Sequence, residues 1–83
     1  MGNSNKENPI LLVFDCISLG THEIQTTDQV KLKKVLERLS KRINTPLSKI
    51  GDVKYNYSPL DKNRKISELG LRSGAVIQVN FKD

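Results

Sequence analysis

Apolar and polar positions repeat along this chain of 83 residues with two different periods, and the shorter period predicts strands. Residues 10–17, ILLVFDCI, form a short apolar run that is typical of a strand covered on at least one face. A turn follows at Gly20, a residue type that readily adopts a positive φ. Residues 22–26 alternate, with His22 and Ile24 on one face. The two segments therefore predict a β-hairpin.

The longer period, of three to four residues, governs the next part of the chain. It predicts a helix of about four turns that carries a single apolar stripe. Thr27 and Asp28 are good N-cap residues, so we expect the helix to begin beside them. Asn44 and Pro46 predict where it ends. The stripe consists of Leu32, Val35, Leu36, Leu39 and Ile43.

Strict alternation returns after the helix. It predicts a half-buried strand from Gly51, and it assigns both tyrosines of this segment to the core. The apolar members are Val53, Tyr55 and Tyr57, and Lys54 and Asn56 separate them. Residues 58–65 are mostly polar and predict a charged loop.

Two glycines stand four residues apart in the segment ISELGLRSGAVIQVNF, residues 66–81. A phosphate-binding loop would need Lys and then Ser or Thr after its second glycine, followed by a helix. Here a strand pattern, residues 75–81, follows Gly74. We therefore expect Gly70 to end a short helical turn and Gly74 to occupy a tight turn. In the last strand Ile77, Val79 and Phe81 share a face, and Gln78 and Asn80 point away.

Composition sets the class of protein. The hydrophobic fraction, 36%, supports one modest core, and no apolar run reaches the roughly 18 residues that span a bilayer. We expect residues 1–9 to be a disordered arm and residues 10–83 a single domain. The polar start carries no secretory signal pattern, so we expect a cytoplasmic protein without membrane insertion.

Candidate chemistry comes mainly from charge. The net charge is +5, which suits an acidic protein surface, nucleic acid or anionic lipid. The helix carries basic residues outside its apolar stripe, and these are candidates for partner binding, although such a face can also be a solvated flank. They are Lys33, Lys34, Arg38, Lys41 and Arg42. Cys16 and His22 are each the sole residue of their type, so we expect no catalytic residue, no metal site and no cofactor.

The order of these elements, a hairpin, a helix, a strand, a short helical turn and a last strand, resembles the β-grasp fold of ubiquitin-like proteins. Further likeness lies in Leu60, the segment ISEL of residues 66–69, Leu71, Gly74 and the IQV of residues 77–79. The resemblance implies an α+β fold, with a mixed sheet of about four to five strands and one main helix packed across it.

A narrower resemblance concerns VFD at residues 13–15, GTHEI at residues 20–24 and the terminal strand. These segments are similar to the YukD/EsaB group, small ubiquitin-like accessory proteins of type VII (WXG100 or ESX-type) secretion in Gram-positive bacteria. His22, where a Tyr is expected, and the polar arm depart from the group's pattern. The resemblance implies a non-enzymatic accessory or regulatory factor that binds a component of the secretion machinery.

Two alternatives stay open at this point. One is a ubiquitin-like or SUMO-like adaptor domain of a larger eukaryotic protein, and the other is a small basic nucleic-acid-binding module. The chain ends in FKD rather than the Gly-Gly of conjugated modifiers, so we expect no conjugation. A polar outer sheet face argues against binding to ubiquitin receptors. Its expected residues are Lys54, Asn56, Gln78 and Asn80. Because both tyrosines are assigned to the core, we expect nucleic acid not to be the partner.

Overall fold

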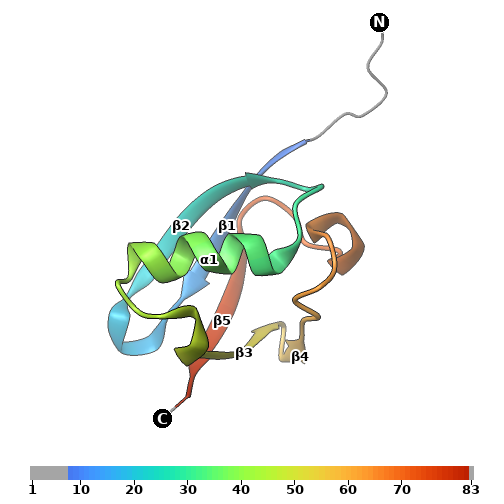
Figure 1. The fold of residues 1–83 in the computed structure, drawn as a ribbon. Coiled ribbons are helices and arrows are strands. Elements are labelled where there is room, and N and C mark those ends of the chain that lie inside the picture. The colour runs from blue at the N-terminus through green and yellow to red at the C-terminus, as the bar shows by residue number, and fades with distance from the viewer. Residues whose placement is uncertain (1–7, 83) are drawn as a thin grey trace, which may run out of the picture.

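The computed structural model describes residues 8–82 and contains a five-stranded mixed sheet with one α-helix lying across it (Figure 1). The strands are β1 (Pro9–Asp15), β2 (Thr21–Thr27), β3 (Ile50–Tyr55), β4 (Ser58–Pro59) and β5 (Ala75–Phe81), and the helix is α1 (Leu32–Arg42). Three 3₁₀ segments connect them: η1 (Ile17–Leu19), η2 (Leu47–Lys49) and η3 (Ile66–Leu69). This is the α+β arrangement that the sequence predicts.

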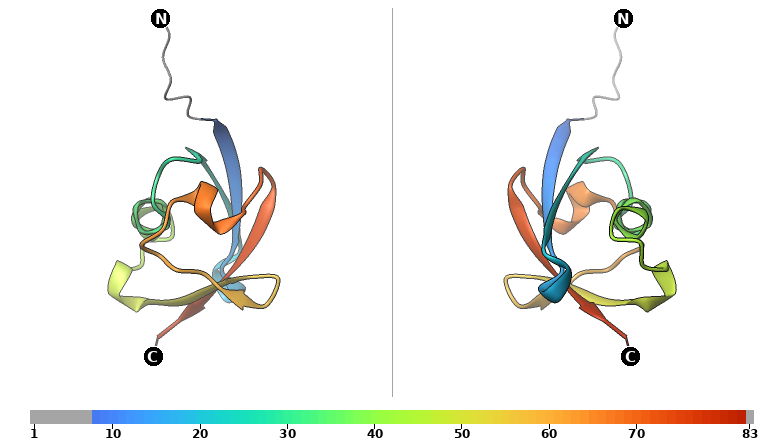
Figure 2. Two further views of the ribbon diagram at one scale, coloured as in Figure 1. Left: turned by 90° about the vertical axis from the view of Figure 1, so that its right-hand side faces the viewer. Right: turned by 90° about the vertical axis from the view of Figure 1, so that its left-hand side faces the viewer.

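The strand order in the sheet is β2-β1-β5-β3-β4. The first strand, β1, pairs antiparallel with β2 and parallel with β5, and β3 pairs antiparallel with β5 and β4. Figure 2 shows α1 on one side of the sheet; within residues 8–82 no second helix covers the other side. One face of the sheet is therefore built into the core, and the other is left as surface.

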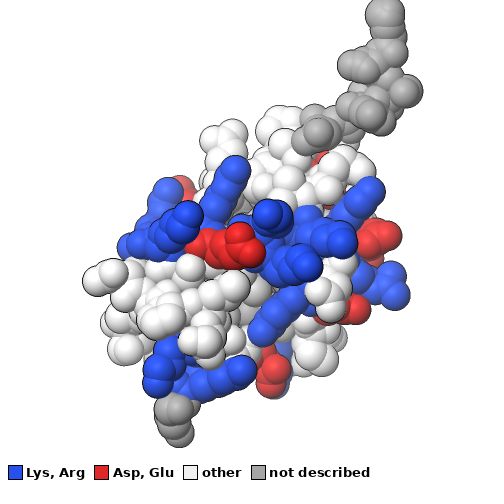
Figure 3. All heavy atoms as spheres, in the orientation of Figure 1, with Lys and Arg blue, Asp and Glu red and all other residues white. Residues whose placement is uncertain are grey.

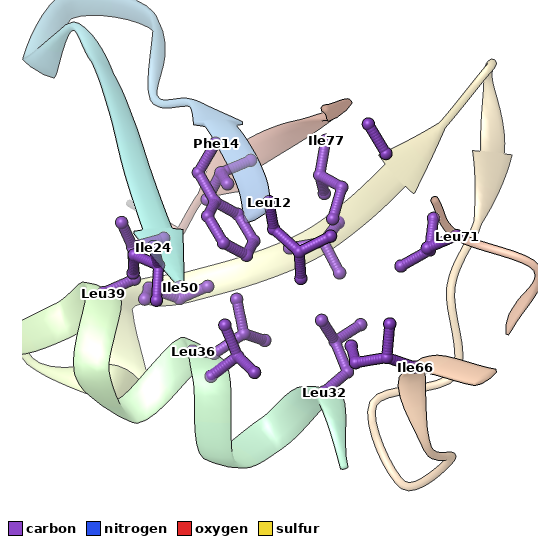
Figure 4. Close-up of a cluster of buried hydrophobic side chains, with 14 of the residues drawn as sticks. Leu12, Phe14, Ile24, Leu32, Leu36, Leu39, Ile50, Ile66, Leu71 and Ile77 are labelled. Atoms are coloured by element: carbon purple, nitrogen blue, oxygen red, sulfur yellow. The ribbon is translucent and has the colours of Figure 1, made fainter. Parts of the chain in front are cut away.

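The core lies between α1 and the sheet face that it covers (Figure 4). Leu12 and Phe14 of β1 and Ile77 of β5 point into it and are fully buried. The helix stripe is confirmed, because Leu32, Val35, Leu36 and Leu39 are buried and Ile43 packs against the cluster from the helix C-cap. No helix in the described part of the chain has both the length and the hydrophobicity needed to cross a membrane.

The start of the helix differs from the prediction. Helix α1 begins at Leu32, four residues after Asp28, because the carboxylate of Asp28 serves another segment. It accepts hydrogen bonds from the backbone amide and the side-chain amide of Asn8, both at 3.1 Å. This clamp and the start of β1 at Pro9 place residues 8 and 9 in the folded part rather than in the expected arm. Residues 1–7, which make up the rest of that arm, lie outside the described residues.

A distant loop satisfies the first backbone amides of the helix. The amide of Leu32 donates to the carbonyl of Arg64 at 3.0 Å, and the amide of Lys33 donates to the carbonyl of Lys62 at 2.9 Å. The Lys62 ammonium in turn donates to the carbonyl of Gly51 in β3 at 2.7 Å. Since carbonyl groups of this loop occupy the amides that a side-chain cap would bind, α1 begins without such a cap.

The segment after β3 also departs from the prediction. Tyr55 is half-buried against the core, but Asn56 and Tyr57 have φ values of 54° and 67° and form the turn into β4. Two consecutive positive φ values are the mark of a type I′ hairpin turn. Tyr57 is therefore 86% exposed, and its assignment to the core was wrong. The pair Ser58–Pro59 is a short strand and not part of a loop.

The glycine assignments are confirmed. Gly70 has a φ of 71° and caps the C-terminal end of η3, and Gly74 has a φ of 91° in the turn before β5. Both conformations belong to the left-handed region that side chains other than glycine rarely adopt. The segment that carries these glycines is therefore a connection between η3 and β5, as the sequence indicates.

Candidate partner-binding face of the helix

The exposed side of α1 carries three of the five predicted cations around one shallow hollow. Lys34, Arg38 and Lys41 line this hollow of about 450 Å³, together with Val30 and Glu37. Figure 3 shows basic side chains gathered across the face over α1, with acidic groups among them. The helix therefore presents an apolar contact at its N-terminal end and positive charge along its length.

The other two predicted cations lie on opposite flanks of the helix. Lys33 and Arg42 are nine residues apart, which in an α-helix of 3.6 residues per turn corresponds to a rotation of about 180° between their side chains. Arg42 lies on the flank that faces β2, where it follows Arg38 by one helical turn. Lys33 thus belongs to a different surface from the hollow.

Two of the cations are already engaged within the described part of the protein. One guanidinium nitrogen, Nη1 of Arg42, donates to the carbonyl of Glu23 at 2.9 Å. The corresponding nitrogen of Arg38 donates to the carbonyl of Gln25 at 3.3 Å. Both acceptors belong to β2, so these arginines tie the helix to the edge of the sheet. They combine a structural contact with their charge.

Lys34 and Lys41 differ from the arginines. Residues 8–82 contain one ion pair, between Arg64 and Asp61, and neither lysine takes part in it. Neither lysine ammonium has a hydrogen-bond partner among these residues. Glu37 is the sole carboxylate that lines the same hollow. The two lysines are therefore exposed cations on a helix that its buried stripe holds rigidly, with their charges available to a partner.

Charge is unevenly distributed between the helix and the first hairpin. Residues 9–27 contain no lysine or arginine, and the charged residues of this segment are the acidic Asp15 and Glu23. Every lysine and arginine of the described chain lies from Lys31 to Lys82. Because like charges are clustered in this way, the first hairpin is the part of the described chain that attracts an acidic molecule least.

The outer face of the sheet is only partly the polar surface that the sequence predicts. Gln78 and Asn80 are exposed there, but Asn56 lies in the hairpin turn instead. Sequence reasoning missed an apolar group on this face, formed by Leu11 and Val13 of β1 and Val76 of β5. The group is compact because Val13 and Val76 are register partners, and Val76 is 50% exposed. The run of consecutive apolar residues in β1 could have predicted this group, because successive residues of a strand point to opposite faces of the sheet.

His22 and Cys16 shape the first hairpin. Nε2 of His22 lies 2.8 Å from the carbonyl oxygen of Leu19 in η1. Cys16 is fully buried, and burial, helped by the charge of Asp15, raises the pKa of its thiol. Residues 8–82 hold no group of three or more His, Cys, Asp or Glu side chains that could bind a metal. The arrangement of these two residues fits packing better than reactivity.

Comparison with known proteins gives the fold. No family profile and no curated protein matches the sequence. Among solved structures, a de novo designed protein based on ubiquitin is similar, with a TM-score of 0.80. The match covers 92% of this chain and 92% of that chain at 13% sequence identity, which shows the fold alone. The chain therefore has a ubiquitin-like α+β fold, while its place in the YukD/EsaB group stays a prediction.

Proposed function

We propose that this protein is a non-enzymatic accessory factor of type VII secretion that binds a protein partner through its helix. Binding is supported by the ammonium groups of Lys34 and Lys41, which lie at the hollow beside Val30 and have no hydrogen-bond partner within residues 8–82. An acidic protein surface with an apolar residue at one end, opposite Val30, complements this arrangement. Because Arg38 and Arg42 already bind β2, the two lysines are the freest cations of the face.

Physical considerations support a role in association rather than in folding. Exposed charges contribute little to the stability of a fold, so cations without a partner are not explained by folding. Charges on a rigid element accelerate the encounter with an oppositely charged protein and make the rate depend on salt. The buried stripe of α1 supplies that rigidity, since four of its residues are almost completely enclosed.

The assignment to type VII secretion has a different basis. It comes from the similarity of residues 13–15 and 20–24 to the YukD/EsaB pattern. In this fold the two segments are joined by η1, where the Asp15 carboxylate accepts a hydrogen bond from the Ile17 amide at 3.2 Å and Gly20 has a φ of 86°. The shared residues thus have local structural roles, and the assignment calls for a direct test in the host.

The test is a complementation experiment. The gene is deleted in its host, and the amount of a WXG100 protein in the culture supernatant is measured. The deletion strain then receives the wild type, Lys34→Glu/Lys41→Glu or the control Lys33→Glu/Lys49→Glu. The control makes the same change in charge at exposed positions outside the hollow.

We expect secretion to fall in the deletion strain, and to return with the wild type and the control but not with Lys34→Glu/Lys41→Glu. Unchanged WXG100 secretion in the deletion strain would refute the assignment to type VII secretion. Full rescue by the variant at the hollow would instead refute the helix as the binding face. The two parts of the proposal therefore fail in distinguishable ways.

The nucleic-acid alternative is tested on the purified protein. Tyr57 is an exposed aromatic, but it lies on the β3–β4 turn, away from α1 (Figure 2). A base that stacks on Tyr57 would therefore not lie over the helix cations. We expect no change in the fluorescence anisotropy of a labelled single-stranded oligonucleotide at about 150 mM salt; salt-sensitive binding there would favour this alternative.

A further inference from the structure

The strand β2 is an edge strand whose outer side faces α1 and solvent. It pairs with β1 on one side, and within residues 8–82 no strand pairs with its other side. The carbonyls of Glu23 and Gln25 point to this open side, since the two helix arginines reach them. In an extended strand the N–H and C=O of one residue point to the same side, so the amides of these two residues face outward too.

The register of β1 agrees with this orientation. Leu11 is the partner of Gln25, and it directs its own amide and carbonyl to the opposite side. Its amide donates to Oγ of Ser73 at 3.0 Å, and its carbonyl accepts from the amide of Gly74 at 2.7 Å. The outward groups of Glu23 and Gln25 are thus not needed for the pairing of β1 with β2.

The second edge of the sheet is closed in another way. Strand β4 contains two residues, Ser58 and Pro59, and proline has no amide proton to donate. Short edge strands and edge prolines are common protections against pairing with another chain. By contrast, β2 is seven residues long and contains neither proline nor lysine. Its carbonyls at Gln25 and Glu23 are instead bound by Arg38 and Arg42.

We propose that Arg38 and Arg42 keep the β2 edge closed, and that this edge is a latent interface for the β2 strand of a second copy of the chain. A charged donor binds a carbonyl more strongly than a neutral amide does. An incoming strand would have to displace both guanidinium groups before it could form its own ladder. The arginines therefore make pairing unfavourable while the helix stays in place.

A second β2 is the occupant because the edge is complementary to itself. In an antiparallel arrangement about a two-fold axis at Ile24, Glu23 of each copy lies opposite Gln25 of the other. Both residues direct their amides and carbonyls outward, so each pair can exchange two hydrogen bonds. The pairing also places a carboxylate opposite a neutral amide rather than opposite a second carboxylate, which would be unfavourable.

The experiment compares the oligomeric state of three forms by sedimentation equilibrium. We expect the wild type to be monomeric and Arg38→Gln/Arg42→Gln to form dimers. The dimer dissociation constant should fall by at least about tenfold, because two charge-assisted bonds no longer compete. The control Lys34→Gln/Lys41→Gln removes the same charge from the same helix without touching β2, and it should remain monomeric.

A further substitution locates the interface. Gln25→Pro in the Arg38→Gln/Arg42→Gln background removes an outward amide that the sheet does not use, so it should restore the monomer. The proposal is overturned if the folded double variant stays monomeric at the highest soluble concentration, if Gln25→Pro leaves the dimer intact, or if the lysine control dimerises equally. If the double variant does not fold, Arg42→Gln alone is used, which removes the shorter of the two arginine–carbonyl hydrogen bonds. This single variant must also dimerise, although more weakly.

Discussion

The amide and the side chain of Asn8 both bind the carboxylate of Asp28, each at 3.1 Å, and the amide of Asp28 donates back to the carbonyl of Asn8 at 3.0 Å. These three bonds fasten the beginning of β1 to the turn that leads from β2 into α1. The hydrogen bond from the Asn8 side chain, followed by that from its backbone, lowers the pKa of Asp28 below its ordinary value.

This clamp predicts an acid-dependent part of the stability. Since the pKa of Asp28 is lowered in the folded state, its contribution is fully present above the ordinary carboxyl range, about pH 4, and is lost as the pH falls through the folded-state value. Asp28→Asn should therefore lower the free energy of unfolding at neutral pH and flatten its decline in acid. Urea unfolding across this pH range measures both effects. Coinciding pH curves for the two proteins would show that the clamp contributes nothing.

The helix stripe predicts a large loss of stability on truncation. Leu36 lies in the middle of α1 and is 1% exposed. Leu36→Ala should cost about 2–5 kcal/mol, because it removes buried methyl groups and leaves a cavity. In a domain of this size we expect a fall in melting temperature of roughly 10 °C or more. The exposed neighbour substitution Glu37→Ala should change it little, and equal effects of the two would contradict the assigned core.

The turn at Asn56 and Tyr57 predicts a stabilising substitution. Tyr57 holds a φ of 67° while its side chain is almost entirely in solvent. Tyr57→Gly creates the Asn-Gly pair that type I′ turns favour and should raise the stability by up to about 1 kcal/mol. The control is Ser58→Gly in β4, which should lower the stability of the protein. Thermal unfolding measures both; a destabilised Tyr57→Gly protein would mean that the ring makes contacts that matter.

Much of the fold follows from the sequence because periodicity reflects which side of an element is buried. The stripe from Leu32 to Leu39 and the alternation in β5 both gave the correct faces. The start of the helix could not be deduced in this way, since the groups that occupy Asp28 and the first helix amides come from Asn8 and the loop at residues 62–64. Likewise, alternation continued through Tyr57, although the chain reverses there.

The candidate surface was predicted only as a set of charges. Sequence spacing placed Arg38 and Arg42 with Lys34 and Lys41, but it could not separate them by their contacts. The carbonyls that bind the arginines are 13 and 19 residues away, at Gln25 and Glu23. The distinction matters for experiments, because a charge reversal that includes Arg42 changes the sheet edge as well as the helix face.

The central claim is that a partner docks on α1, and site-specific crosslinking in the host tests it most directly. A photoreactive amino acid replaces Glu37 at the hollow in one strain and Gln78 on the uncovered sheet face in another, so that both lysines of the hollow are kept. We predict a crosslinked partner from position 37 and none from position 78. That adduct should disappear when Lys34→Glu is added. A crosslink from position 78 alone, unaffected by Lys34→Glu, would contradict the account.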